Sequence, residues 1–395
     1  MRGACDAAIQ RLGNNTPGLL RKLAKTGWLV ENNNMEWLHK TEKYLTKQWE
    51  RFSLLAVVFG FICDSWFLSR IDFLPGNIVL FSYIVVSGFC IILLNLIEAG
   101  RIKTPFFKDR VMLFTLIMQF VFGNLFSGFV VSYSQGGAFY TSWPFIIMLV
   151  AFLFGNEFVL DKYEKFTFQM SIYFTAVFSF SIFFVPILLN RFGVDTFLIG
   201  GVLSLGLVSG ILYTLSRFNK DGIRKSRNGL IASIGGIYIL FNIMYFTNII
   251  PPVPLSIKNI GVYHLVEKQS NGKYLLSKEV QNNWWPFANE TIHITQGNEL
   301  YCFSSVFAPT DIKTKIFHRW ERYDEKNGKW VEMMRFSYPI VGGKDYGYRG
   351  YTIKENVTAG LWRCDVITER DQIVGRVKFK VVVSDVKPVI VSEIK

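Results

Sequence analysis

The residues best suited to chemistry are histidines, arginines and aromatic side chains in the last third of the chain. Of the four histidines, His264, His293 and His318 lie in this part. None belongs to an HxH or HExxH arrangement, which would favour a zinc site. The sequence also lacks a GxSxG turn and a phosphate-binding glycine loop. We therefore expect a protein that is not an enzyme, with no metal and no cofactor.

Ligand recognition is the chemistry that these residue types favour. Flat aromatic rings stack on sugars, and the arginine guanidinium binds carboxylates and phosphates. Peptidoglycan or another glycan of the cell envelope would suit such a set. The alternative is a place in the core, because small β domains need large side chains. The candidate ligand-binding residues are His318, Trp320, Tyr346, Tyr348, Arg349, Tyr351 and Arg363.

The pattern around these candidates predicts β-strands. From about residue 256 onward, short alternating apolar runs are separated by turn residues. Asn271-Gly272 and Asn327-Gly328 supply hairpin-type turns. Eight or so runs without a helical period favour an all-β antiparallel sandwich over residues 255–395.

Two of the five cysteines, Cys302 and Cys364, share this strand-rich region. They would form a disulfide in an oxidising compartment, and two separate buried thiols are an equally good alternative. Successive side chains of a strand point to opposite faces, so Trp362 and Cys364 share one face. Both suit a core better than a binding site.

An ordered series of motifs between Tyr301 and Val383 resembles a bacterial family, the domain of unknown function 2914. The resemblance implies a small β domain, carried by envelope proteins and sometimes placed behind membrane helices, and it implies no established activity. Cys364 stands where the family pattern has an aliphatic residue, so no thiol role follows from it. The matching motifs are His318-Arg319-Trp320, Gly342-Gly343, Gly347-Tyr348-Arg349-Gly350-Tyr351, Gly360-Leu361-Trp362-Arg363-Cys364-Asp365-Val366, Gly375-Arg376 and Phe379.

The middle of the chain predicts a multi-pass α-helical membrane domain at residues 52–254. Half of all residues are hydrophobic, only 18% are charged, and most of the 37 phenylalanines precede Pro251. Seven apolar stretches of about 20 residues are long enough to cross a hydrocarbon core of roughly 30 Å. We expect these spans near 52–69, 76–97, 111–133, 140–160, 167–189, 196–216 and 230–250.

Basic residues in the expected loops predict the orientation of the spans. The second, fourth and sixth loops carry most of them, and the other loops carry one at most. By the positive-inside rule, the N-terminal segment 1–51, with an amphipathic or solvated helix, is cytoplasmic. The C-terminal domain is then periplasmic, at the inner membrane of a bacterium. An even number of spans would place it in the cytoplasm.

The same loop charges account for much of the net charge of +13, so we expect no nucleic-acid partner. The expected partners are the lipid bilayer and a periplasmic glycan or envelope protein. The leading hypothesis is a sensor or scaffold whose β-sandwich recognises that partner.

A membrane transporter or enzyme, with the β domain as accessory, is the competing hypothesis. Polar residues inside spans are its candidates. Asp64 and Glu157 lie near opposite membrane faces, which favours interfacial positions and gives no relay at the midplane. Gly206 and Gly210, beside Gly200 and Ser204, form a small-residue packing motif. The intramembrane candidates are Asp64, Asn124, Asn156 and Glu157.

Overall fold

The computed structural model describes part of the chain, and the rest of the fold is taken from these residues alone. The first expected span, with Asp64, falls largely outside them, and so do the N-terminal segment and Tyr346. The described residues are 61–62, 74–108, 110–134, 139–158, 165–280, 290–295, 299–309, 312–343, 347–384 and 388–395.

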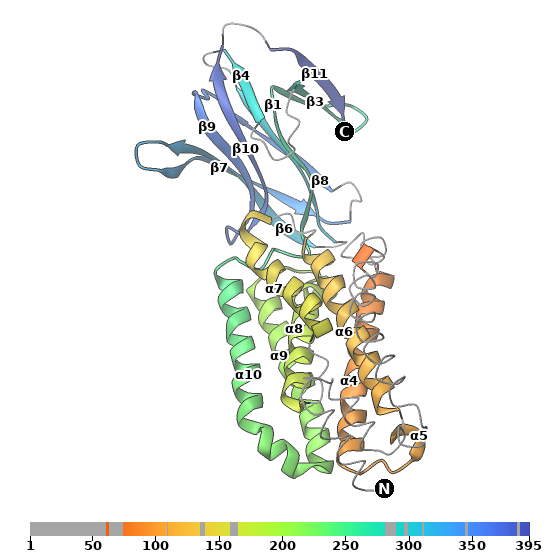
Figure 1. The fold of residues 1–395 in the computed structure, drawn as a ribbon. Helices are drawn as coiled ribbons and strands as arrows, with labels where there is room; N and C mark the ends of the chain where they lie inside the picture. The colour runs from red at the N-terminus through yellow and green to blue at the C-terminus, as the bar shows by residue number, and fades with distance from the viewer. Residues whose placement is uncertain are drawn as a thin grey trace, which may run out of the picture. The chain divides into compact units, whose positions relative to one another are not determined.

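Seven helices occupy the described part of residues 52–254, which we call the membrane half (Figure 1). Five of them, α4, α6, α8, α9 and α10, are long and apolar enough to cross a membrane, and α7 has a shorter apolar core. These six helices coincide with the second to seventh expected spans. Their bounds are α4 (Leu74–Glu98), α5 (Pro105–Lys108), α6 (Val111–Ser134), α7 (Phe139–Phe158), α8 (Phe166–Leu189), α9 (Val194–Phe218) and α10 (Lys220–Phe246).

The basic segment after α9 differs from the expected loop, because α10 begins ten residues before the last expected span. Only Asn219 separates the two helices. Its side-chain oxygen accepts a hydrogen bond from the Gly222 N–H at 3.1 Å, which caps the start of α10. The basic residues Arg224, Lys225 and Arg227 therefore belong to a helix, since lysine and arginine are good helix formers.

Helix α8 is the central helix of the membrane half. Its apolar window is 78% buried, against 28% for α9 and for α10. Polar side chains join it to three neighbours: Gln169 to Asn95 of α4 at 2.8 Å, Ser171 to Ser233 of α10 at 2.9 Å, and Ser181 to Ser204 of α9 at 3.2 Å. Hydrogen bonds of this kind stabilise helix pairs where lipid supplies no hydrophobic drive.

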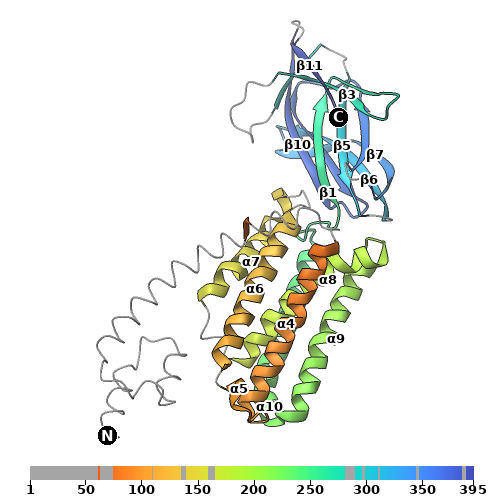
Figure 2. The same ribbon diagram turned by 90° about the vertical axis from the view of Figure 1, so that its right-hand side faces the viewer.

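Small residues bring α8 and its neighbours into close contact at some of the expected positions. A Cβ atom at Gly200 would lie 3.3 Å from the Ser181 side chain and carbonyl oxygen, whereas Gly206 and Gly210 have nothing within 4 Å. Gly88 of α4 faces Tyr173 of α8, and α4 and α9 lie side by side in Figure 2. The small-residue motif therefore packs inside the chain at Gly200 and Ser204 only.

The C-terminal region is strand-rich, as expected, with more strands than the pattern predicted. The strands form three sheets of order β1-β5-β8, β4-β10-β9-β6-β7 and β11-β3-β2. All pairs are antiparallel except β4–β10, which is parallel. The strands are β1 (Ser256–Tyr263), β2 (Leu265–Lys268), β3 (Tyr274–Glu279), β4 (Glu290–Ile294), β5 (Leu300–Phe307), β6 (Lys313–Asp324), β7 (Lys329–Val341), β8 (Tyr348–Lys354), β9 (Gly360–Thr368), β10 (Ile373–Val383) and β11 (Ile390–Ile394).

Both expected hairpin turns are present. Gly272 lies between β2 and β3 and Gly328 between β6 and β7, with φ of 77° and 62°. Only glycine adopts such a conformation without a steric cost. The second turn closes a long hairpin in which β7 is the last strand of the five-stranded sheet, with a bulge opposite Trp320 and Glu321.

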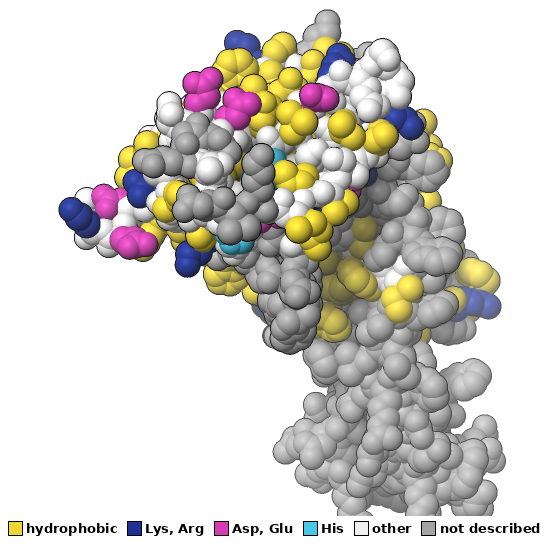
Figure 3. All heavy atoms as spheres, turned by 90° about the horizontal axis from the view of Figure 1, so that it is seen from above, with side chains coloured by type: hydrophobic (Ala, Val, Ile, Leu, Met, Phe, Trp, Pro, Cys, Tyr) yellow, Lys and Arg dark blue, Asp and Glu magenta, His cyan; other side chains and the backbone are white. Residues whose placement is uncertain are grey.

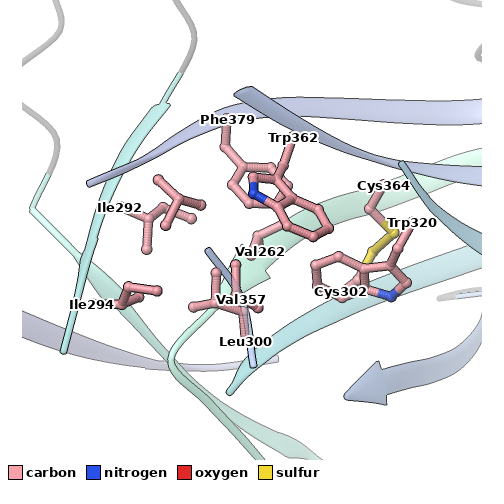
Figure 4. Close-up of a cluster of buried hydrophobic side chains, with 11 residues drawn as sticks. Val262, Ile292, Ile294, Leu300, Cys302, Trp320, Val357, Trp362, Cys364 and Phe379 are labelled. Atoms are coloured by element: carbon pink, nitrogen blue, oxygen red, sulfur yellow. A yellow bond between two sulfur atoms is a disulfide. The ribbon is translucent and has the colours of Figure 1, made fainter. Parts of the chain in front are cut away.

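One buried cluster lies between the β1-β5-β8 sheet and the five-stranded sheet (Figure 4). Cys302 of β5 is bonded to Cys364 of β9, so a disulfide joins the two sheets. Trp320 and Trp362 are buried beside it, with 0% and 1% of their surfaces exposed. The expected core positions of Trp362 and Cys364 are confirmed.

The chain divides into two compact units. The second unit consists of Ser132–Ile146, Ile182–Ile199 and Ile243–Lys395, so it contains all the described strands together with some helix ends.

Replacing Gly200 and Gly206 by leucine separates a packed helix position from an open one. We expect Gly200→Leu to cost roughly 1–3 kcal/mol through overpacking against Ser181. Gly206→Leu should stay within about 0.5 kcal/mol, because its position is open. Thermal unfolding of the full chain in detergent, followed by far-ultraviolet circular dichroism, measures both. Equal destabilisation by the two changes would contradict the packing.

Candidate functional site

Strand β6 places His318 and Trp320 in the interior. Both are fully buried. The His318 Nε2 atom lies 2.7 Å from the Ser304 hydroxyl and 3.1 Å from that of Tyr338. Its Nδ1 atom lies 3.1 Å from the Thr352 hydroxyl, which also accepts a hydrogen bond from Trp320 Nε1 at 3.0 Å. These two candidates therefore form a buried polar network, where a ligand cannot reach them without opening the core.

Burial also determines the charge of His318. It lowers the pKa of the imidazole from 6.5 to about 3, because the charged form loses its hydration in the core. The ring is therefore uncharged at neutral pH, and hydroxyl groups satisfy both of its nitrogens. The Cys302–Cys364 disulfide lies next to it, with ligand atoms of all three residues within 4.8 Å of one another.

The opposite face of the same strands carries an ionic network. Asp365 of β9 is completely buried, and its carboxylate accepts two hydrogen bonds of 2.6 Å from Arg376 and one of 3.1 Å from Arg319. The candidate Arg363 is hydrogen-bonded to Glu321, and its Nε atom also lies 3.8 Å from the Asp365 carboxylate. The three arginine side chains are only 12–16% exposed. Such buried, paired charges hold neighbouring strands in register, and Arg363 is not available to grip a ligand.

The two networks explain the spacing of the motifs on which the family resemblance rests. In His318-Arg319-Trp320 the outer two residues face the core and the middle one faces the ionic network. The same alternation runs along β9, where Trp362 and Cys364 lie in the core. These two motifs, on β6 and β9, thus record two faces of one sheet rather than a surface site.

Close approach of neighbouring segments accounts for the two glycines of the Gly347–Tyr351 motif. A Cβ atom at Gly347, which has a φ of +78°, would lie 3.0 Å from the Val306 backbone. A Cβ atom at Gly350 would lie 2.9 Å from the Tyr338 ring. Both glycines let β8 pack tightly.

Strand β8 separates the remaining candidates. Tyr348 stacks on Tyr338 with ring centroids 6.2 Å apart and packs against the core. Tyr351 lies on the other side of the strand, 6.0 Å from the ring of Tyr301 and 6.3 Å from that of Tyr274. Arg349 shares the side of Tyr351, because the two are two positions apart along the strand.

We call this surface the tyrosine face, and define it by Tyr274, Tyr301, Arg349, Tyr351 and Ile353. Tyr351 and Ile353 expose 36% and 37% of their surfaces, while the first two rings are largely buried. A hydrogen bond from the Tyr301 hydroxyl to Glu299, at 2.6 Å, raises the pKa of Tyr301 to about 12, helped by burial. The tyrosine face is thus a small, partly exposed aromatic platform beside a guanidinium.

Figure 3 shows hydrophobic side chains gathered on the upper end of the strand-rich region, with charged side chains mostly at the margins. The exposed hydrophobic residues near the C-terminus include Val389 at 75%, Val391 at 51% and Ile394 at 57%. An apolar surface of this kind is typical of a contact region rather than a catalytic one.

A third polar cluster, around Glu279, was not predicted from the sequence. The Glu279 carboxylate, only 7% exposed, lies 2.8 Å from His264 Nε2 on one oxygen and 2.8 Å from His293 Nδ1 on the other. The three residues come from different segments, so no short sequence spacing indicates that they lie together. Motif searches for paired histidines examine short windows and cannot detect such a set.

Among the intramembrane candidates, the structure describes the side chain of Asn124 only. Its amide donates to the Phe120 carbonyl, one turn earlier in α6, at 2.7 Å. Asn156 and Glu157 belong to α7, but their side chains fall outside the described part, as does Asp64. The one described candidate, Asn124, is thus bonded within its own helix.

The fold thus defines a class, a protein with apolar helices of membrane-spanning length and a disulfide-bonded, strand-rich C-terminal region. Residues 313–381 match the family described as protein of unknown function (DUF2914), which confirms the expected resemblance in the C-terminal region. The matched segment runs from β6 into β10 and includes the residues that β6 and β9 contribute to the two networks. No curated protein matches the chain.

Two solved structures have low similarity to the chain. A β-glucosidase from Listeria innocua in complex with gluconolactone is 11% identical, with a TM-score of 0.18, and the match covers 30% of this chain and 17% of that one. The alkylpurine DNA glycosylase AlkC of Pseudomonas fluorescens, bound to DNA containing an abasic site analog, is 8% identical, with a TM-score of 0.20. That match covers 79% of this chain and 99% of the other. Scores this low support no argument about fold or function.

The low pKa of His318 predicts acid lability. In the unfolded chain His318 binds a proton below its ordinary pKa of 6.5, whereas in the folded chain it binds one only near pH 3. The free energy of unfolding therefore falls as the pH falls from 6.5 to about 3. The loss should be on the order of 1 kcal/mol per pH unit. Chemical unfolding of the full chain, followed by tryptophan fluorescence, measures it. His318→Gln should flatten this part of the pH profile, and an unchanged profile would contradict the burial of a neutral imidazole.

Proposed function

We propose that the chain is a multi-pass protein of the bacterial inner membrane, with about seven transmembrane helices. Its C-terminal domain is an antiparallel β-sandwich that lies in the periplasm and recognises an envelope glycan or partner protein. In this role it acts as a sensor or scaffold, with the helices as its anchor.

The disulfide between Cys302 and Cys364 is the observation that carries this proposal. Disulfides persist in oxidising compartments, such as the bacterial periplasm, and are rare in the cytosol. Both cysteines are completely buried, so the bond belongs to the folded core. The loop charges favour the same side of the membrane for this region.

A sandwich is the architecture that best accounts for the core. Side chains of Cys302 and Leu300 from one sheet and of Trp362 and Phe379 from the other belong to one buried cluster. Two largely antiparallel sheets that share a core, with a disulfide between them and a tryptophan against it, are typical of sandwich domains.

The tyrosine face is the surface that best suits recognition of a glycan. Tyr351 offers a partly exposed ring for stacking, and Ile353 extends the apolar surface beside it. Arg349 adds a positive charge on the same side of β8, which favours sugars that carry a carboxylate. Peptidoglycan fragments combine both properties.

The orientation can be measured by labelling cysteines with a membrane-impermeant maleimide in intact cells. In a chain with Cys5, Cys63 and Cys90 changed to serine, we expect Asn327→Cys, in the β6–β7 turn, to be labelled from outside. Lys225→Cys, at the start of α10, should be labelled only after permeabilisation, since the positive-inside rule places it in the cytoplasm. The reverse pattern would refute a periplasmic domain.

Ligand recognition can be tested with the full chain in detergent. We expect soluble peptidoglycan fragments to bind, and Tyr351→Ala to weaken binding by about 2- to 12-fold, the loss of one stacking interaction. Arg349→Ala should weaken the binding of carboxylate-bearing fragments more than that of neutral chitooligosaccharides. Phe336→Ala is the matched control, because Phe336 is 53% exposed on β7, outside the tyrosine face. Equal effects of Tyr351→Ala and the control, or no saturable binding, would refute this assignment.

A further inference from the structure

The disulfide and its neighbouring histidine contain the donor atoms of a metal site. One ligand atom each from Cys302, His318 and Cys364 lie within 4.8 Å of one another, and all three residues are completely buried. They come from β5, β6 and β9, and therefore from both sheets of the core.

We propose that these three side chains bind one Zn²⁺ ion when the disulfide is reduced. Reduction by a phosphine consumes one water, breaks the S–S bond, leaves two thiols and converts the phosphine to its oxide. Binding of the ion then forms two Zn–S bonds and releases the two thiol protons. In the oxidised protein the sulfur atoms are bonded to each other and provide no thiolate.

The donor set is a usual one for zinc. Two thiolates and one imidazole are three of the four ligands of a Cys₂His site, and a hydroxyl or water oxygen completes the tetrahedron. The Ser304 hydroxyl, 2.7 Å from His318 Nε2, supplies one such oxygen beside the histidine.

The surroundings of His318 suit a metal ligand. Its two ring nitrogens have hydroxyl partners on opposite sides of the ring, Ser304 and Tyr338 at Nε2 and Thr352 at Nδ1. If one nitrogen exchanges its hydroxyl for the metal, the other keeps a hydrogen bond that orients the ring. A hydrogen bond on the second nitrogen is the usual arrangement around a zinc-bound histidine.

Zinc would join the same two sheets that the disulfide joins. A structural metal site contributes its binding free energy to the stability of the fold. The reduced chain with zinc should therefore keep the packing of Trp320 and Trp362, whereas the reduced chain without metal loses the covalent link between the sheets.

Cobalt binding by the full chain in detergent tests the proposal. With Cys5, Cys63 and Cys90 changed to serine, only the two core cysteines remain. Under anaerobic conditions we expect the phosphine-reduced chain to bind one Co²⁺ per molecule, with a thiolate-to-cobalt charge-transfer band that Zn²⁺ abolishes. The oxidised chain should show no band. His318→Gln should weaken binding at least about tenfold, as losses around metal ligands do. His293→Gln, a change to the histidine at Glu279, should not.

A reduced chain that keeps its strand signal in circular dichroism but shows no charge-transfer band would overturn the proposal. So would a band that His318→Gln leaves unchanged. If reduction unfolds the strand-rich region, Zn²⁺ must restore the near-ultraviolet signal of the buried tryptophans, and failure to do so would also overturn it.

Discussion

The covalent link between β5 and β9 is the constraint on which the strand-rich region depends. The cysteines are 62 residues apart in the sequence, so the bond closes a long loop and removes many conformations from the unfolded chain. Small β domains have little core with which to offset their conformational entropy. A cross-link in the same cluster as Trp320 and Trp362 strengthens the core at its largest side chains.

Two networks of different kinds occupy the two faces of the five-stranded sheet. On the inner face, His318 is uncharged, so its hydrogen bonds to hydroxyls carry no cost of burying an ion. On the outer face, the carboxylate of Asp365 lies among arginines, and its burial is tolerated because charged donors occupy both of its oxygens. The buried groups His318 and Asp365 thus find their partners by different means on the two faces.

The parts of this fold that local patterns determine could be predicted. The apolar helices follow from the length and composition of single segments, and alternation along β9 placed Trp362 and Cys364 on one face. The start of α10 was missed because its charged first turns hide a helix that Asn219 caps. Sheet order, including the parallel β4–β10 pair, joins segments far apart in the sequence, and no short window contains that information.

The candidate site shows the same limit. Alternation separated Arg363 from Trp362 and Cys364 on their strand, but it could not tell that a second sheet covers one face and an ionic network the other. The cluster at Glu279 also depends on pairing between distant strands, so its histidines looked isolated in the sequence. Tyr351 and Tyr348 were grouped because they are near in sequence, although the strand sends them to opposite sides.

The position of β7 at the end of its sheet affects the solubility of this protein in a crowded cell. A strand of 13 residues with a free edge offers a row of unpaired backbone groups, and Val331 and Met333 are exposed along it. Such an edge is a template for aggregation. The bulge and Pro339 interrupt the regular spacing that an incoming strand would need, since proline has no N–H to donate. These two irregularities thus favour solubility over association, at an edge whose apolar side chains alone would promote the opposite.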